Sequence, residues 1–155
     1  LARYEKVDYE VYVSYSQKPL NIELIEALGG YSLIRLADLK KALFDVAWKV
    51  EGNYLVLTSS RRTIRFKFFE PIMIGFVVKD GELKYALYRI PYPAVKLYGT
   101  YYVPLRTTLR AFGYGVRFLG KEKKIIFGSD VSVDDSNLIF VRYITKKEVE
   151  ELAKQ

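Results

Sequence analysis

The sequence has no histidine and no cysteine among its 155 residues, and only one methionine and one tryptophan. Without cysteine the chain forms no disulfide and offers no thiolate for catalysis. Without histidine it lacks the imidazole ligands of copper sites, the Ser-His-Asp triad and the usual acid–base side chain at neutral pH. No apolar run approaches the roughly 18 residues that span a bilayer. These absences predict a protein that is not an enzyme and holds no cofactor.

Two short motifs are too incomplete to bind a ligand. The run from Asp130 through Ser132 to Asp134 and Asp135 has the acidic spacing of a calcium loop, but it lacks the glycine and the distal glutamate of such loops. Gly113-Tyr114-Gly115 does not continue into a phosphate-binding pattern. The sequence therefore predicts no metal site and no nucleotide site of a familiar type.

What the chain does contain is apolar, aromatic and basic. Half of the residues are hydrophobic, 28% are charged, and 14 are tyrosines. The composition is globular, and the length suits one domain or two small halves with a shared core. The net charge of +7 favours an anionic partner, although it also serves solubility. Asparagine and glutamine are scarce beside lysine and glutamate, a bias that indicates a thermophilic source.

The hydrophobic pattern predicts an α+β fold, with antiparallel sheets of hairpins wrapped around short helices. Alternating strands flank turn signals such as Glu51-Gly52-Asn53 and Asp80-Gly81. Helices are expected over residues 22–28, 36–44 and 105–113, with Leu36, Leu39, Leu43 and Phe44 on one apolar face of the second. A C-terminal strand and helix follow, and Thr145 and Glu148 have capping-box spacing.

An internal repeat organises the chain. Leu36 and Leu105 are 69 residues apart, as are Leu43 and Phe112, and the hairpins after them correspond at an offset of 70. Each unit is a hairpin, a strand, a short helix and a hairpin. The repeat predicts a first, degenerate unit over residues 1–70, a second over 71–129, and a strand–helix cap over 130–155. Together they are expected to form one compact body.

The second unit resembles a known family. Its pattern of a hairpin, an extended stretch, a Tyr-Val-Pro-Leu-Arg motif, a short helix, a glycine and a Val-x-aromatic strand is similar to the N-terminal, or stalk, domain of the copper amine oxidase type. The first unit departs from it, because Arg35-Leu36-Ala37 stands where the family has Pro-Leu-Arg. The residues that carry the motif, and that we expect to be structural, are Pro104, Leu105, Arg106, Gly113, Val116 and Phe118.

The resemblance implies a fold and a location more than an activity. Such domains occur mostly in extracytoplasmic bacterial proteins, often as repeats, and the stalk is not their catalytic or copper-binding part. The chain begins at Leu1, which a cleaved signal peptide or a truncation would explain. The sequence thus predicts a secreted or cell-envelope module that attaches to a wall polymer or a partner protein.

A basic and tyrosine-rich surface is the candidate ligand site. Charge interleaved with aromatic rings suits a glycan or another polyanion. A basic intracellular module that binds single-stranded nucleic acid is the alternative, and a solvated sheet face with protective edge lysines is the simplest interpretation. The candidate residues are Tyr98, Tyr101, Tyr102, Tyr114, Arg61, Arg62, Arg65 and Lys67.

Overall fold

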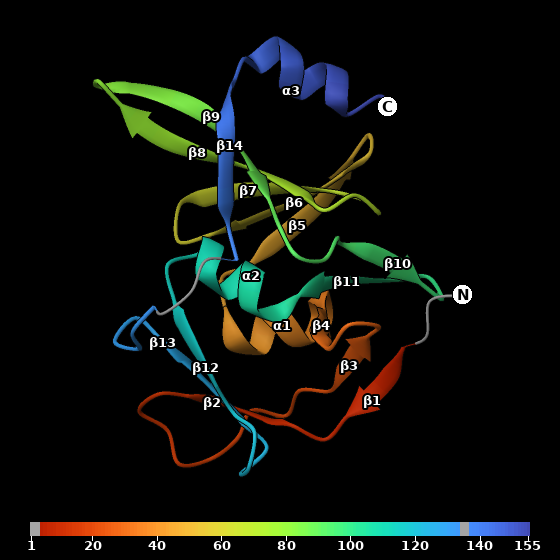
Figure 1. The fold of residues 1–155 in the computed structure, drawn as a ribbon, viewed down its shortest axis with the longest axis vertical. Coiled ribbons are helices and arrows are strands. Elements are labelled where there is room, and N and C mark those ends of the chain that lie inside the picture. Colours follow the sequence, from red (N-terminus) through yellow and green to blue (C-terminus); the bar gives the residue numbers. More distant parts are fainter. Residues whose placement is uncertain (1–3, 134–136) are drawn as a thin grey trace.

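The computed structural model describes residues 4–133 and 137–155 (Figure 1). The elements of this part of the chain, in order, are β1 (Glu5–Val7), β2 (Glu10–Val13), β3 (Leu24–Ala27), β4 (Tyr31–Arg35), α1 (Leu36–Ala42), β5 (Ala47–Glu51), β6 (Tyr54–Ser59), β7 (Arg62–Lys67), β8 (Ile72–Lys79), β9 (Glu82–Arg89), β10 (Val95–Leu97), β11 (Thr100–Pro104), α2 (Leu105–Ala111), β12 (Gly115–Leu119), β13 (Lys124–Gly128), β14 (Ile139–Ile144) and α3 (Lys146–Leu152). The expected α+β class, with mostly antiparallel sheets and short helices, is confirmed.

The strands form three sheets. The largest has the order β14-β9-β8-β7-β6-β5, and the second has the order β1-β3-β4-β11-β10; the paired strands in both are antiparallel. The third, β12-β13-β2, contains a parallel pair between β13 and β2. Helix α3 lies on the outer side of the six-stranded sheet, and α1 and α2 lie between that sheet and the lower strands (Figure 1).

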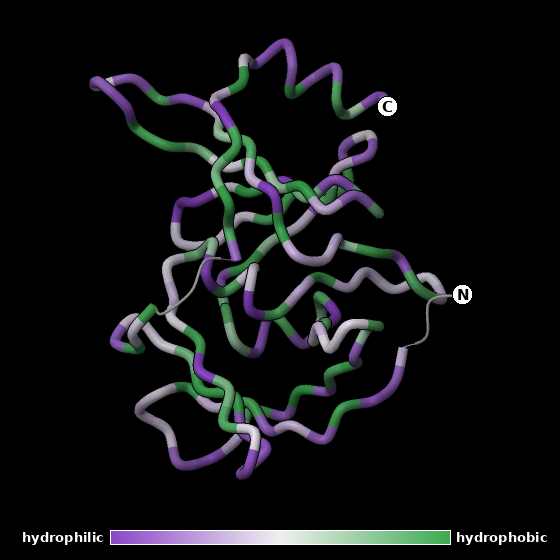
Figure 2. Tube along the Cα trace, viewed as in Figure 1, coloured by the Kyte–Doolittle hydropathy of each residue, from purple (hydrophilic) through white to green (hydrophobic). Residues whose placement is uncertain are grey.

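The main hydrophobic core surrounds the two central helices. It combines Leu36 and Leu39 of α1 with Leu105 and Leu109 of α2, and it includes Phe66 from the sheet above them. Figure 2 shows the same distribution, with hydrophobic segments in the strands around the helices and hydrophilic ones at the β8–β9 tip. Each fully buried side chain of this kind contributes about 1.5–3 kcal/mol.

A smaller core lies between the six-stranded sheet and α3. Tyr54 and Val56 of β6 pack there with Val149 of α3, while Leu55 and Leu57 point the other way into the main core. This double burial explains why β6 is apolar at successive positions and does not alternate. The predicted capping box at Thr145 and Glu148 is present and begins α3.

Two local predictions are wrong. The segment expected to form a helix over residues 22–28 contains strand β3, which pairs with β1 on one side and β4 on the other. The main-chain hydrogen bonds to both neighbouring strands outweigh the helical spacing of its leucines. Gly29 and Gly30 form the β3–β4 turn. Phe44, expected on the buried face of the next helix, follows the end of α1 and is 85% exposed.

Candidate functional site

An aromatic cleft opens beside the end of β7. We use this name for the hollow of about 530 Å³ that is lined by the Gly52–Asn53 turn and by Lys67, Phe68, Phe69, Glu70, Lys96 and Tyr101. The residues come from the β5–β6 turn, the β7–β8 connection and the β10–β11 hairpin. A hollow of this size lies within the range of ligand-binding clefts.

Backbone hydrogen bonds hold the walls of the cleft together. The Phe68 amide donates to the carbonyl of Asn53 at 2.9 Å, and the Phe69 amide donates to the carbonyl of Ala94 at 2.9 Å. These bonds tie the β7–β8 connection to the β5–β6 turn and to the segment that leads into β10. The backbone from which Phe68 and Phe69 project is therefore fixed on both sides.

Phe69 has a strained backbone and an exposed ring. Its φ is +62°, in the left-handed region that bulky residues rarely adopt, and the residue is 62% exposed. Such a conformation costs on the order of 1–3 kcal/mol and persists only where the surroundings enforce it. Here the strain keeps an aromatic side chain at the mouth of the cleft, a position in which glycine would be the stable choice.

Phe68 joins the other two rings of the cleft into one cluster. Its ring centroid lies 5.4 Å from that of Tyr101 and 6.5 Å from that of Phe69, with interplanar angles of 34° and 40°. The ammonium of Lys96 lies 5.4 Å from the centroid of the Tyr101 ring. At that distance the positive charge is attracted to the negative face of the ring.

A charged pair lines the same cleft. The Lys67 side chain is only 6% exposed, and its Nζ lies 2.6 Å from a carboxylate oxygen of Glu70, which is half-exposed. The pair neutralises the buried lysine and leaves carboxylate oxygens accessible. Such oxygens accept hydrogen bonds from hydroxyl groups, while the neighbouring rings offer apolar faces. This combination suits a ligand that has both C–H faces and hydroxyls.

The structure separates the predicted tyrosines. Tyr101 lines the aromatic cleft, whereas its neighbour Tyr102 packs on the other face of β11, against a small core of Ala27, Leu33 and Val95. Tyr98 stands fully exposed at the tip of the same hairpin. Tyr114 follows α2 and packs edge-on against the ring of Phe127, 6.0 Å away.

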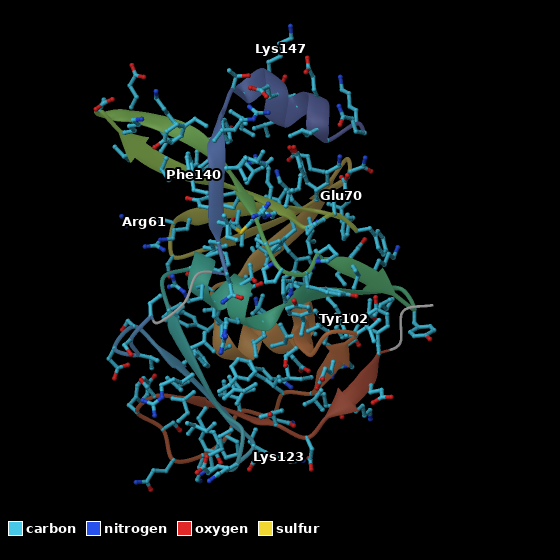
Figure 3. All side chains as sticks on the ribbon, in the orientation of Figure 1. Arg61, Glu70, Tyr102, Lys123, Phe140 and Lys147 are labelled. Atoms are coloured by element: carbon cyan, nitrogen blue, oxygen red, sulfur yellow. The ribbon has the colours of Figure 1, made fainter. Side chains whose placement is uncertain are left out.

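The basic residues are divided as well. Lys67 lines the cleft, while Arg65, on the same face of β7, places its guanidinium 5.7 Å from the ring of Tyr85. Arg61 and Arg62 line a different hollow, at the other end of β7. Figure 3 shows Arg61 and Glu70 at opposite ends of the six-stranded sheet, and Tyr102 below it.

The motif residues lie around α2. Pro104 precedes the helix and Leu105 is fully buried at its start. Arg106, expected to be structural, lies with its guanidinium 4.4 Å from the ring of Phe118. Val116 is buried in the main core, and Gly113 has φ +97°. The two halves of the motif therefore contact each other, because the arginine of the helix stacks on the aromatic residue of the following strand.

The residues of the cleft that the sequence did not single out are Phe68, Phe69, Glu70 and Lys96. No local signal marks Phe69, because it lies in the turn after β7 and its outward direction depends on a positive φ. The pairing of Lys67 with Glu70, and the contact of the β10–β11 hairpin with this turn, depend on tertiary structure.

Comparison of the chain with protein-family models, with curated proteins and with solved structures gives no match. Among the described residues, no group of three or more acidic side chains is placed to hold a metal ion. Residues 134 and 135 of the incomplete calcium-loop run lie outside the described residues; Asp130 of the same run accepts a hydrogen bond from the Ser14 hydroxyl. No described helix has the length and apolar character needed to cross a membrane.

Proposed function

We propose that the protein is a non-catalytic binding module of the cell envelope, and that its aromatic cleft binds a sugar residue of a wall polymer. The observation that carries the proposal is the joint presence of three aromatic side chains and a paired carboxylate in one preformed hollow. The C–H face of a sugar ring packs against the negative face of an aromatic ring, and its hydroxyls donate to the carboxylate. The charge of +7 adds attraction to an acidic polymer.

We also propose that the body of the protein consists of two copies of one stalk-like unit. Helices α1 and α2 both have seven residues and begin 69 residues apart, at Leu36 and Leu105. Strands β4 and β11, which precede them, pair antiparallel with Ile34 opposite Val103, and these two residues are also 69 apart. A pair of equivalent residues at the centre of an antiparallel contact is the arrangement that a local two-fold axis between two copies produces.

The extracytoplasmic location belongs to the same proposal and is supported by the resemblance of the second unit to stalk domains. Secreted binding modules commonly present an aromatic surface on a rigid scaffold, and the cleft described above is a surface of this type. A partner protein that inserts an apolar side chain between Phe69 and Tyr101 is the competing ligand, and nucleic acid is the alternative outcome of the experiment below.

The test is retention of the purified protein on an insoluble cell-wall fraction across a salt series. Tyr101→Ala should weaken retention by about tenfold, the effect expected for loss of a central aromatic contact. Tyr15→Ala is the matched control, because Tyr15 is 88% exposed and does not line the cleft. Retention that survives high salt supports sugar stacking, since contacts between neutral groups are not screened.

The variant Phe69→Gly tests whether the strained backbone at Phe69 is retained because its ring binds the ligand. Glycine adopts the left-handed conformation without penalty, so this variant should unfold at a higher urea concentration than the natural protein. The same variant should lose retention on the wall fraction, because the exposed ring is gone. A more stable variant that binds as well as the natural protein would contradict the proposed role of the cleft, as would retention on single-stranded nucleic acid alone.

A further inference from the structure

A second hollow lies at the opposite end of the six-stranded sheet from the aromatic cleft. We call it the arginine groove; its volume is about 650 Å³, and the residues that matter here are Arg61, Arg62, Met73, Tyr88, Arg110 and Leu138. It runs between the β6–β7 turn, strands β8 and β9, and the C-terminal end of α2. Among the described residues, three arginines and no aspartate or glutamate line it.

Arg62 is fixed by the end of α2. Its Nη1 donates to the carbonyl of Ala111 at 3.3 Å, one of the helix-end carbonyls that lack a partner within the helix. Gly113 provides the space, because a Cβ at this position would lie 3.0 Å from the same nitrogen. The guanidinium, which carries five N–H donors, is thus held by the backbone on a side chain that is exposed and lines the groove.

The turn that carries Arg61 is clamped. Ser60 and Arg61 are the two central residues of the β6–β7 hairpin, and both have positive φ, +49° and +65°. Asp45 accepts hydrogen bonds from the Ser59 hydroxyl at 2.6 Å and from the Ser60 amide at 2.8 Å. These two bonds hold the pKa of the Asp45 carboxyl below its usual value, so the clamp stays charged at neutral pH. A turn without glycine is kept in a left-handed conformation that fixes the arginine at the rim of the groove.

Arg110 is the third cation of the groove. It lies on α2 beside the carbonyl that holds Arg62, and its Nε is buried without a hydrogen-bond partner in the described part of the chain. A buried guanidinium N–H without an acceptor is costly and is uncommon in folded proteins. An anion in the groove would supply the missing acceptor.

We infer that the arginine groove binds a phosphate monoester whose organic part is a compact ring. A ligand with a single carboxylate would neutralise only one of the three guanidinium groups. A phosphate monoester carries about −1.5 to −2 charges at neutral pH and offers three acceptor oxygens. The planar fork of arginine fits those oxygens in pairs. Met73, Tyr88 and Leu138 supply an apolar wall for the ring. One hollow of this size suits a small molecule better than a polymer backbone, which requires a continuous track of cations and rings.

The experiment uses phenyl phosphate as the probe and measures binding to the full chain by calorimetry. Inorganic phosphate and phenol, each half of the probe, should bind more weakly than phenyl phosphate. Arg110→Gln and Arg62→Gln should each raise the Kd by about tenfold or more, as expected for loss of hydrogen bonds to a charged group. Arg117→Gln is the charge-matched control, since Arg117 is exposed on β12 and does not line the groove.

Two further measurements keep the inference falsifiable if a groove variant folds poorly. Binding of phenyl phosphate to the natural protein should weaken as the pH falls below about 6, where the monoester takes up a proton. Tyr101→Ala, in the aromatic cleft, should leave the Kd unchanged, which separates this site from the proposed function. The inference is overturned if the three arginine variants weaken binding equally, if binding is absent, or if a single-stranded oligonucleotide binds far more tightly through the same arginines.

Discussion

The two helix–hairpin units share a pattern of burial and differ in how they satisfy their polar groups. In both, the first, third, fourth and eighth residues from the helix start are buried; they are Leu36, Asp38, Leu39 and Leu43 in one unit, and Leu105, Thr107, Thr108 and Phe112 in the other. In a core, the volume and direction of a side chain are constrained more tightly than its chemical type. The two segments therefore both bury these four positions, although the third carries a carboxylate in Asp38 and a hydroxyl in Thr107.

The first unit buries a charge. The Asp38 carboxylate accepts hydrogen bonds from the Glu23 amide at 3.1 Å and from Arg35 Nε at 3.0 Å, and it lies 2.9 Å from Lys41 Nζ. The second unit has Thr107 at the position of Asp38, and the next residue closes the helix locally, because the Thr108 hydroxyl donates to the carbonyl of Pro104 at 2.7 Å. The Asp38 carboxylate thus connects α1 to the residue before β3, whereas the Thr108 hydroxyl bonds only within its own helix.

The largest effect should come from removing equivalent core leucines. Leu36→Ala and Leu105→Ala each leave a cavity between the two helices and should cost about 3 kcal/mol. Since both residues belong to one hydrophobic cluster, each variant should still unfold in a single urea transition with an unchanged m-value. A biphasic transition in either variant would show that the segments 1–70 and 71–129 unfold independently.

Asp38 tests the difference between the units. Asp38→Ala leaves the Glu23 amide without its acceptor and frees two cations that are half-exposed, so the expected cost is about 2 kcal/mol. Asp38→Thr, which introduces the residue of the second unit at the equivalent position, should cost less. Equal costs for the two variants would show that a hydroxyl cannot replace the carboxylate here.

The same residue gives the stability a pH dependence. Burial alone would raise the pKa of the Asp38 carboxyl, but hydrogen bonds from Arg35, Lys41 and the Glu23 amide outweigh burial and lower it. Its contribution is complete above the ordinary aspartate pKa of about 4 and is lost as the pH falls through the lower folded value. The stability difference between the natural protein and Asp38→Ala should therefore be constant near neutral pH and shrink in acid.

Much of the fold could be predicted from local sequence, because hairpins and caps are local. Asp80-Gly81 and the Thr145–Glu148 capping box specify their structures within a few residues. Strand β3 could not be predicted, because its sequence also fits a helix and its two neighbouring strands decide the outcome. The third sheet could not be predicted either, because the parallel pairing of β2 with β13 joins segments more than a hundred residues apart.

The candidate sites, like the fold, could be predicted only in part. Tyr101, Lys67, Arg61 and Arg62 could be selected from their residue types, because aromatic and basic side chains are the usual ligand groups of such surfaces. Their separation into two hollows could not be seen from the sequence, because β7 carries Lys67 at one end and Arg62 at the other. Phe69 is visible only through its positive φ.

The smallest effects concern the residues that follow the two helices, where Phe44 stands at the position of Gly113. Gly113→Ala should cost about 1 kcal/mol or more, because alanine is strained at φ +97° and its Cβ would approach Arg62. Phe44→Ala should change the free energy of unfolding by less than about 0.5 kcal/mol, because the ring is in solvent. Urea titration of both variants measures the contrast. A clear loss in Phe44→Ala would mean that the ring covers an apolar surface in solution, and that the two units resemble each other more closely at this position than their side chains suggest.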